Sequence, residues 1–255
     1  MNLFERKVLV VVPARGGSKR IPKKNLFPMF GQPMIYWPLY ELSKLFLASQ
    51  VLVSTDDDAI LSLAAKKGLS ANYRRPADLA DDHTGTVAVA SHALHWHENT
   101  FGEVEFLVTV YPTAVLLRGN DILEAFRQLE KNREADSIMS ATNFPSPIQR
   151  AVFLGDNGFA QMFQPRHYYS RSQDLVPGFF DAGQFYISRA GSARAGKILT
   201  NSNTLLHPLK REEVIDIDDQ EDLDIALSKI KVSNIAPPPN DWTFKSSPCP
   251  SFRKM

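Results

Sequence analysis

Near its N-terminus the chain reads VLVVVPARGGSKRIPKKN, from Val8 to Asn25, and this stretch decides the fold class. The apolar, mostly β-branched run from Val8 to Val12 is typical of a strand that is buried on both faces, as in a parallel sheet. The basic, glycine-containing segment that follows lies at the carboxyl end of this strand, where open α/β sheets bind their ligands. The stretch therefore predicts a parallel strand followed by a ligand-binding loop.

Strand and helix patterns alternate over most of the chain. Further buried strands are predicted at 51–55 and 106–110, and a shorter one at 184–187. Amphipathic helices are predicted at about 34–46, 57–67, 84–97, 121–132 and 220–230. This alternation predicts a doubly wound α/β fold with a mostly parallel sheet.

Individual residues suggest where these helices begin or bend. Asn120 and Asp219 are predicted N-caps, because their side chains can accept hydrogen bonds from first-turn N–H groups. Pro33 suits a first helical position. Pro38 is expected to remove a backbone hydrogen bond and to kink its helix.

Two segments depart from this alternation. From about Asn143 to Gly178 the helical periodicity disappears and four prolines interrupt the chain. So long a connection predicts an inserted arm that covers a site or contacts a second subunit. After residue 233 the chain becomes rich in proline and serine, so 234–255 is predicted to be a disordered tail. One domain is therefore expected over residues 1–233.

Composition excludes several classes of protein. The formal net charge is only +1, whereas a nucleic-acid-binding protein more often carries a basic excess. The single cysteine, Cys249, allows neither an intrachain disulfide nor a thiolate cluster. No apolar stretch approaches the ~18 residues of a membrane span, and the first apolar run is too short for a signal peptide. The cytoplasm is the expected compartment, and neither a membrane nor a nucleic-acid partner is expected.

Basic residues are concentrated near the first strand. Between Arg6 and Lys24 the chain has seven basic residues and no acidic one. Glycines let backbone N–H groups approach an anion closely, and basic side chains nearby can neutralise a polyphosphate. The spacing is that of neither a dinucleotide fingerprint nor a P-loop. Phosphate binding is favoured, and a basic surface loop remains the alternative.

Acidic residues are concentrated late in the chain, with eight acids and no base between Glu212 and Asp224. A strand would place Asp216 and Asp218 on one face, because side chains on a strand repeat every two residues. Two such carboxylates repel each other unless a cation lies between them. Mg²⁺ commonly takes one or two carboxylates together with substrate phosphates. The pair is interpreted as a magnesium site, with helix capping by Asp218 as the alternative.

Four motifs in order resemble those of the acidic-sugar cytidylyltransferases, which include the N-acetylneuraminate and 3-deoxy-octulosonate enzymes. They are ARGGSK at 14–19 with Pro22 and Lys24-Asn25, VSTDD at 53–57, RPADLA at 75–80, and DID at 216–218. The resemblance covers about Lys7 to Ile230. It implies a Rossmann-like nucleotidyltransferase fold and transfer of CMP from CTP to a 2-keto sugar acid, expected here to have nine carbons, with release of pyrophosphate. The length of the arm predicts a homodimer.

The resemblance also implies residue roles. Arg15, Lys19 and Asp218 would be catalytic, and Asp216 and Asp218 would hold Mg²⁺. The phosphates would meet the rest of the first motif: Ala14, Gly16, Gly17, Ser18, Lys24 and Asn25. Arg75, Thr84 and Thr86 would face the base and the ribose.

Two departures from the sialate enzymes bear on the sugar. Tyr111 stands where those enzymes have a base-contacting glutamine, and the FDAGQFY motif at 180–186 lacks their arginine. This motif instead resembles the pseudaminic acid branch of the family, as do the segments 145–150 and 172–175. The implied sugar contacts are Gln149, Arg150, Gln173, Asp181 and Gln184.

Three alternatives remain open on the sequence. The sugar acid could be N-acetylneuraminate, legionaminate or 3-deoxy-octulosonate. The enzyme could instead act on a sugar 1-phosphate, although the glycine-rich loop of such enzymes is usually longer. The chain could also bind a nucleotide without catalysis.

Overall fold

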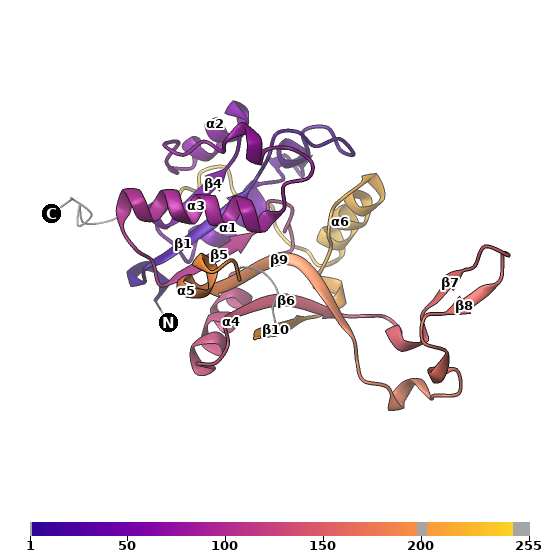
Figure 1. The fold of residues 1–255 in the computed structure, drawn as a ribbon. Coiled ribbons are helices and arrows are strands. Elements are labelled where there is room, and N and C mark those ends of the chain that lie inside the picture. The colour runs from indigo at the N-terminus through magenta and orange to yellow at the C-terminus, as the bar shows by residue number, and fades with distance from the viewer. Residues whose placement is uncertain (1, 198–202, 247–255) are drawn as a thin grey trace.

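A six-stranded sheet forms the centre of the molecule (Figure 1). The computed structural model describes residues 2–197 and 203–246. The strands follow the order β10-β6-β9-β5-β1-β4. They are β1 (Val8–Pro13), β4 (Val51–Ser54), β5 (Phe106–Val110), β6 (Ser137–Asn143), β9 (Phe179–Arg189) and β10 (Thr204–Leu209). Among these described strands only β9 runs antiparallel to its neighbours, which confirms the mostly parallel sheet.

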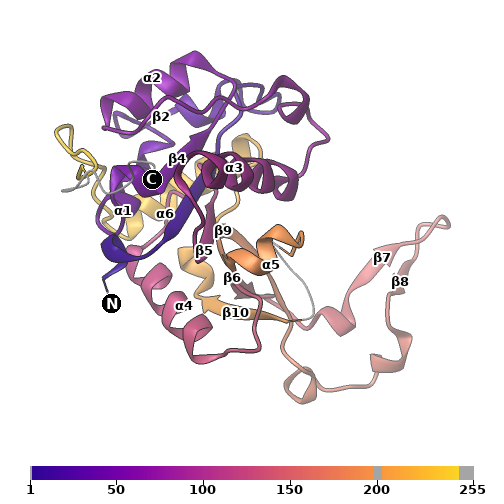
Figure 2. The ribbon, with the colours of Figure 1, turned by 60° about the vertical axis from the view of Figure 1, so that its left-hand side comes forward.

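Helices cover both faces of this sheet (Figure 2). The flanking helices are α1 (Tyr36–Ser43), α2 (Asp58–Lys66), α3 (Thr86–Phe101), α4 (Gly119–Lys131) and α5 (Ala190–Arg194). Val8, Val10 and Val12 pack in one apolar layer with residues of α1, α2 and α4. Leu9 and Val11 pack in a second layer with residues of α3 and α5. The alternation of β1 side chains between two layers confirms the doubly wound fold. None of the helices within the described ranges has the length and apolarity that a membrane crossing requires.

The two proline expectations near α1 are corrected. Helix α1 begins at Tyr36 rather than Met34, so Pro38 lies in the first turn. First-turn N–H groups have no partner within a helix, so Pro38 removes no helical hydrogen bond there. Pro33 lies in the short strand β3 (Gln32–Pro33), which pairs with β2 (Pro28–Met29), and not in a helix.

The two predicted helix caps have different outcomes. Helix α4 begins one residue before Asn120, and its N-cap position is Arg118, so that prediction is wrong. Asp219 caps α6 (Gln220–Val232) as predicted, and its side chain accepts a hydrogen bond from the Asp222 N–H.

Two strands of the sheet, β6 and β10, were not predicted. Both mix polar and apolar residues, and buried polar residues of β6 are satisfied inside the sheet. Ser140 on β6 donates its hydroxyl to the carbonyl of Phe185, and Thr142 donates to the carbonyl of Leu209. These long-range hydrogen bonds allow polar residues in a buried strand.

The segment from Asn143 to Gly178 leaves the sheet at the end of β6 and returns at the start of β9. It projects from the body of the molecule as an arm (Figures 1 and 2). The arm contains a two-stranded hairpin made of β7 (Val152–Leu154) and β8 (Ala160–Met162).

The expectation of a disordered tail from residue 234 is corrected as far as residue 246. Trp242 is 7% exposed and Phe244 is 5% exposed, and both belong to the main core. The Trp242 ring packs edge-on against Tyr36 with centroids 5.5 Å apart, and Lys67 donates to the carbonyl of Asn240. Two buried aromatic rings therefore outweigh the proline-rich composition of this segment. Residues 247–255 lie outside the described residues.

Candidate active site

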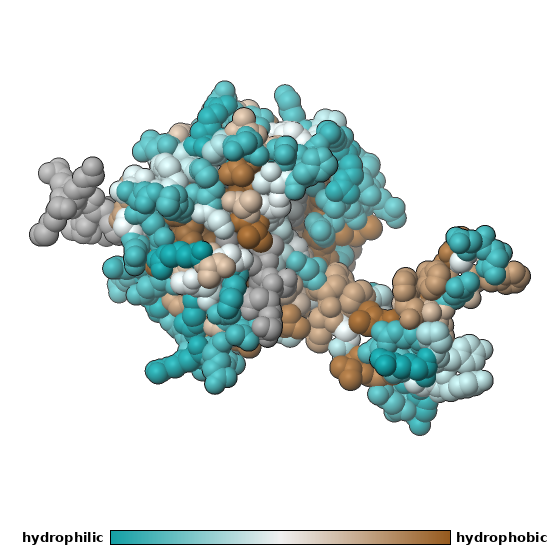
Figure 3. Space-filling view, viewed as in Figure 1, coloured by the Kyte–Doolittle hydropathy of each residue, from teal (hydrophilic) through white to brown (hydrophobic). Residues whose placement is uncertain are grey.

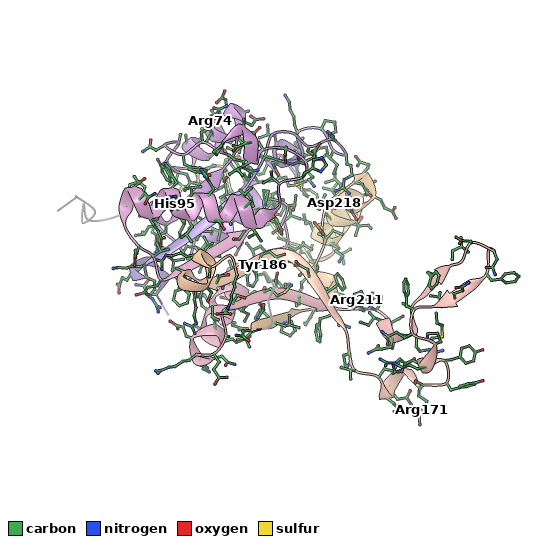
Figure 4. The ribbon with its side chains drawn as sticks, viewed as in Figure 1. Arg74, His95, Arg171, Tyr186, Arg211 and Asp218 are labelled. Atoms are coloured by element: carbon green, nitrogen blue, oxygen red, sulfur yellow. The ribbon has the colours of Figure 1, made fainter. Side chains whose placement is uncertain are left out.

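A polar cavity of about 370 Å³ lies at the carboxyl ends of β1 and β5. Its walls come from four parts of the chain that are far apart in sequence. Figure 4 labels Tyr186 on β9 and Asp218 before α6, which both line it. The full lining is Arg15, Lys24, Tyr111, Thr113, Asp181, Gly183, Tyr186, Asp216 and Asp218.

The basic loop, residues Arg15 to Lys24, forms one wall of this cavity. Gly16 fixes its start, because its N–H donates to Oδ1 of Asp56 at 2.9 Å. A Cβ at Gly16 would lie 2.8 Å from Oδ2 of Asp57, so only glycine fits this contact with the end of β4. Gly17, in contrast, has no atom within 4 Å of the position that its Cβ would take.

Carboxylates hold the cations of the basic loop. Arg15 pairs with Asp82 at 2.5 Å, and Lys19 pairs with the same carboxylate. The hydrogen bonds from Lys19, followed by those from Arg15, lower the pKa of Asp82 to about 2. Asp82 therefore occupies, as an anion, the place between two cations that a phosphate would be expected to take.

The second half of the basic loop pairs with Asp218. Arg20 lies 2.9 Å from Oδ2 of Asp218, and Lys24 lies 3.3 Å from its Oδ1. The Lys24 ammonium also donates to the carbonyl of Ile217 at 2.6 Å. The predicted phosphate-binding residues and the predicted metal-binding pair are thus brought together in one place.

Other residues of the first motif shape the basic loop. Ala14 is fully buried, and its N–H donates to the carbonyl of Ser54 at 2.8 Å. Asn25 donates its side-chain amide to the carbonyl of Arg15 at 2.9 Å. Ser18 donates its N–H to the carbonyl of Gly16 at 3.0 Å. Ala14 and Asn25 therefore hold the loop in place, whereas Arg15 and Lys24 face the cavity.

The acidic wall, which consists of Asp181, Asp216 and Asp218, lies opposite the basic loop. Residues 215–218 form no strand of the sheet, which corrects the expected strand. Ile217 is nevertheless fully buried, while Asp216 and Asp218 on either side of it both line the cavity. Loss of hydration, followed by the charge of Asp218, raises the pKa of Asp216 above its ordinary value.

The pair Asp216 and Asp218 fits a Mg²⁺ ion that takes its other ligands from a substrate. Their mutual repulsion is a cost that a divalent cation would offset. In the described part of the chain, no three His, Cys, Asp or Glu side chains cluster as a self-sufficient metal site. Two carboxylates completed by phosphate oxygens is a usual arrangement for Mg²⁺.

Aromatic hydroxyls form the floor of the cavity. Tyr111 and Thr86 share a hydrogen bond at 2.9 Å, which brings the start of α3 to the end of β5. Tyr186 packs edge-on against Tyr111 with centroids 5.8 Å apart, and its hydroxyl donates to Asp181. Gly183 takes a left-handed φ of +62°, and a Cβ there would lie 3.3 Å from the Asp216 carboxyl carbon. Glycine is therefore required at this turn beside the acidic wall.

A neighbouring hollow of about 650 Å³ contains Arg75, next to the cavity. Arg75 is 5% exposed and donates to the carbonyl of Ser54 at 2.7 Å, so it supports the end of β4. The N–H of Thr84 donates to Asp81, and the Arg15 guanidinium donates to the carbonyl of Asp81 at 3.1 Å. The residues that the resemblance assigns to the base and ribose thus lie beside Arg15.

Four of the predicted sugar contacts are not brought to this cavity within one chain. Gln184 is 1% exposed and donates to the carbonyl of Glu213, so it braces the segment that leads to Asp216. Gln149 and Arg150 lie on the arm, where they contact Val176 and Ser172. Gln173 also lies on the arm, near Arg171, which Figure 4 labels.

Several residues of the site were missed by the sequence reasoning. Asp82, the partner of Arg15 and Lys19, comes shortly after the RPADLA motif at 75–80. Nothing in the sequence around it indicates that it pairs with these two cations. Asp56 lies inside the VSTDD motif, and Thr113 follows the departure at Tyr111. Tyr186 closes the motif at 180–186, and its burial could have been inferred from its place in a predicted strand.

Comparisons with known proteins agree with this geometry. The sequence profile of the family described as "Cytidylyltransferase" matches residues 9–181. The chain is 33% identical over 228 residues to "Pseudaminic acid cytidylyltransferase" from Campylobacter jejuni strain 81-176, covering 89% of this chain and 98% of that protein. It is 26% identical to "N-acylneuraminate cytidylyltransferase" from Streptococcus agalactiae serotype V, covering 85% of this chain and 51% of that protein.

A solved structure shares the fold. It is a CMP:2-keto-3-deoxy-manno-octonic acid synthetase complexed with CTP, with a TM-score of 0.64 and 16% sequence identity. The similarity covers 89% of this chain and 99% of that one.

Proposed function

This chain belongs to the cytidylyltransferase family, and we propose that it transfers CMP from CTP to the anomeric hydroxyl of pseudaminic acid. The observation that carries the proposal is the single cavity in which the basic loop faces the acidic wall. In the proposed reaction the oxygen of the sugar hydroxyl attacks the α-phosphorus, and the hydroxyl proton passes to solvent. The bond from that phosphorus to the bridging oxygen breaks, and pyrophosphate leaves.

The basic loop is the proposed triphosphate site. Two of its ion pairs, Lys19 with Asp82 and Arg20 with Asp218, are open to solvent, since the Lys19 side chain is 81% and the Arg20 side chain 64% exposed. Exposed ion pairs contribute little stability, so phosphate oxygens can replace the carboxylates at small cost. Arg15 and Lys19 would then stabilise the charge that accumulates on the departing pyrophosphate.

Asp216 and Asp218 are the proposed ligands of Mg²⁺. When bound, this ion supplies a Lewis acid that neutralises phosphate charge and helps to align the reacting groups. Asp218 becomes available as Arg20 and Lys24 turn from it toward the phosphates. Gln184 keeps the segment before Asp216 in place through its hydrogen bond to Glu213.

The identity of the sugar rests on the relatives and on two positions of the cavity. A relative that aligns with this chain over 98% of its own length is named for pseudaminic acid. Tyr111 and Asp181 supply a hydroxyl and a carboxylate on the side of the cavity away from the basic loop. Both groups suit a sugar with several hydroxyl and amide donors.

A homodimer is part of the same proposal, and the arm supports it; the cytoplasm is the proposed compartment. Figure 3 shows hydrophobic side chains along the arm. Leu154 is 78%, Phe159 72% and Tyr169 93% exposed, which is a large apolar surface for a projecting segment. A second copy of the chain would cover these residues and give Gln149, Arg150 and Gln173 a cavity to contact. The molecular mass in solution tests this, and a mass of one chain would contradict it.

A pyrophosphate-release assay tests the proposed reaction. The full chain is supplied with CTP, Mg²⁺ and, in separate reactions, pseudaminic, legionaminic, N-acetylneuraminic or 3-deoxy-octulosonic acid. We expect the largest kcat/KM for pseudaminic acid. Turnover of 3-deoxy-octulosonic acid alone would overturn the choice of sugar. CTP binding without any turnover would overturn the catalytic proposal.

A further inference from the structure

Asp181 is held in the cavity by two hydrogen bonds from its own strand, β9. The hydroxyl of Tyr186 donates to its Oδ2, and the N–H of Gly183 donates to its Oδ1 at 2.8 Å. Tyr186 is 2% exposed and packs edge-on against Tyr111. The carboxylate therefore has one fixed orientation, set by a buried ring and by a backbone turn.

The protonation state of Tyr186 is also fixed. Burial, followed by the influence of Tyr111 and of Asp181, raises the pKa of Tyr186 above its ordinary value. The phenol therefore stays neutral and remains a hydrogen-bond donor. A carboxylate oxygen has two lone pairs, and each oxygen of Asp181 uses one of them within β9. Each oxygen thus keeps one acceptor position for another group.

The Asp181 carboxylate lines the cavity from an exposed position of β9. Within residues 2–197 and 203–246 no ion pair is formed by Asp181, and its charge contributes to the raised pKa of Asp216. Across those same ranges no cluster of three potential ligands could hold one metal ion, so Asp181 does not complete a site with Asp216 and Asp218. Its oriented oxygens can therefore accept hydrogen bonds from neutral donor groups of a ligand.

We propose that Asp181 selects the acceptor sugar by accepting hydrogen bonds from its O–H and N–H groups, and that Tyr186 is the positioning residue that aims this carboxylate. The inference rests on the proposed cytidylyl transfer. Asp181 repels the carboxylate of the sugar acid, so it favours the orientation in which neutral donors face it. The sugar's own carboxylate then points toward the cationic side of the cavity. The phosphate side of the site does not depend on Tyr186.

The test compares Tyr186→Phe and Asp181→Asn with the wild type in the full chain. Steady-state pyrophosphate release is measured with CTP varied and with the sugar acid varied. Losing the hydrogen bond to a charged group is expected to raise the KM for the sugar acid roughly tenfold in Tyr186→Phe. In Asp181→Asn, where an acceptor becomes a donor, the rise is expected to be about a hundredfold. The KM for CTP should stay within about twofold of the wild type in both variants.

Tyr36→Phe is the matched control. It also removes one buried tyrosine hydroxyl, which donates to the carbonyl of Leu63 at 3.1 Å, but it lies in the core at α1. This variant should leave both KM values at the wild-type level. A change in the ratio of kcat/KM between pseudaminic and N-acetylneuraminic acid is expected for Asp181→Asn alone.

Each outcome decides the inference. An equal rise of the two KM values in Tyr186→Phe, or an unchanged KM for the sugar acid in either variant, would overturn it while the wild type remains active. A matching effect of Tyr36→Phe would show a merely structural role for the hydroxyl and would also overturn it. A wild type that turns over none of the four sugar acids would remove the proposed function, and this inference with it.

Discussion

The basic loop and the acidic wall face each other across one cavity, and they are built in different ways. The loop carries exposed side chains whose partners are other exposed side chains, such as Asp82. In the wall, Asp181 is held by a buried tyrosine and a backbone N–H, and Asp216 follows a segment that the buried Gln184 braces. The difference teaches that the loop can exchange partners, among them Asp218, when a polyphosphate arrives, whereas Asp181 and Asp216 are held in place in advance.

The largest expected effect comes from removing a carboxylate of the wall. Asp218→Ala should lower kcat for pyrophosphate release on the order of a thousandfold, because the proposed Mg²⁺ loses a ligand and Lys24 loses the carboxylate that orients it. The adjacent Asp219→Ala removes the N-cap of α6 instead. It should cost about 1 kcal/mol of folding stability and leave kcat near the wild-type value.

Thermal unfolding and pyrophosphate release, measured on both variants, separate the two roles. Near-normal activity in Asp218→Ala would contradict the metal assignment. A loss of activity in Asp219→Ala as large as that in Asp218→Ala would show that the capping of α6, and not a ligand, controls the site.

A smaller effect is expected from displacing the basic loop. Gly16→Ala places a methyl group against Asp57, so the loop must move and kcat/KM for CTP should fall up to about a hundredfold. Gly17→Ala meets no neighbouring atom and should cause a much smaller loss. Equal losses in the two variants, measured with CTP as the varied substrate, would contradict the importance of the Gly16 contact.

The smallest effect, of the opposite sign, is expected from replacing Asp82, the carboxylate that pairs with two cations of the basic loop. Asp82→Asn removes the carboxylate that competes with phosphate for Arg15 and Lys19, so the KM for CTP should fall about threefold. The change should shrink at high salt, because the competing charges are exposed. An unchanged or raised KM for CTP would mean that Asp82 does not compete.

The pH dependence of this effect follows from the pKa of Asp82, which is lowered to about 2. Because the pKa of Asp82 is lowered, its carboxyl stays ionised and the ion pairs persist at every pH above the ordinary pKa of an aspartate. The ion pairs are lost only as the pH falls toward about 2. The advantage of Asp82→Asn over the wild type should therefore stay constant from about pH 5 to pH 8. An advantage that disappears between these values would assign the competition to another group.

The sequence predicted best the parts whose signals are local. β1 and the ligand-binding loop after it were predicted because an apolar β-branched run and a pair of glycines are signals that lie within a few residues of the chain. β6 was missed because Ser140 and Thr142 are satisfied by partners that only the folded sheet supplies, and β10 because His207 finds its partner, Gln128, on α4. The burial of Trp242 was missed because the proline-rich composition of its segment predicts disorder.

The site shows the same limit. Arg15 and Asp218 were found through motifs, but the pairing of Arg15 with Asp82 joins residues 67 positions apart and leaves no pattern in the sequence. The contact of Gln184 with the sugar stays a prediction, because the position of a residue in a motif cannot tell a buried amide from one that faces a cavity. Its hydrogen bond to Glu213 is visible only in the fold.

A crystal structure with CTP, Mg²⁺ and the sugar acid tests the central claim, which is that the basic loop exchanges its partners while Asp181 stays in place. Lys24 now lies 3.3 Å from Asp218. We expect Lys24 to contact a phosphate oxygen in that complex, with Asp218 on the metal ion and Asp181 still held by Tyr186. A complex in which Lys24 keeps its pair with Asp218, while the triphosphate binds outside this cavity, would contradict the account.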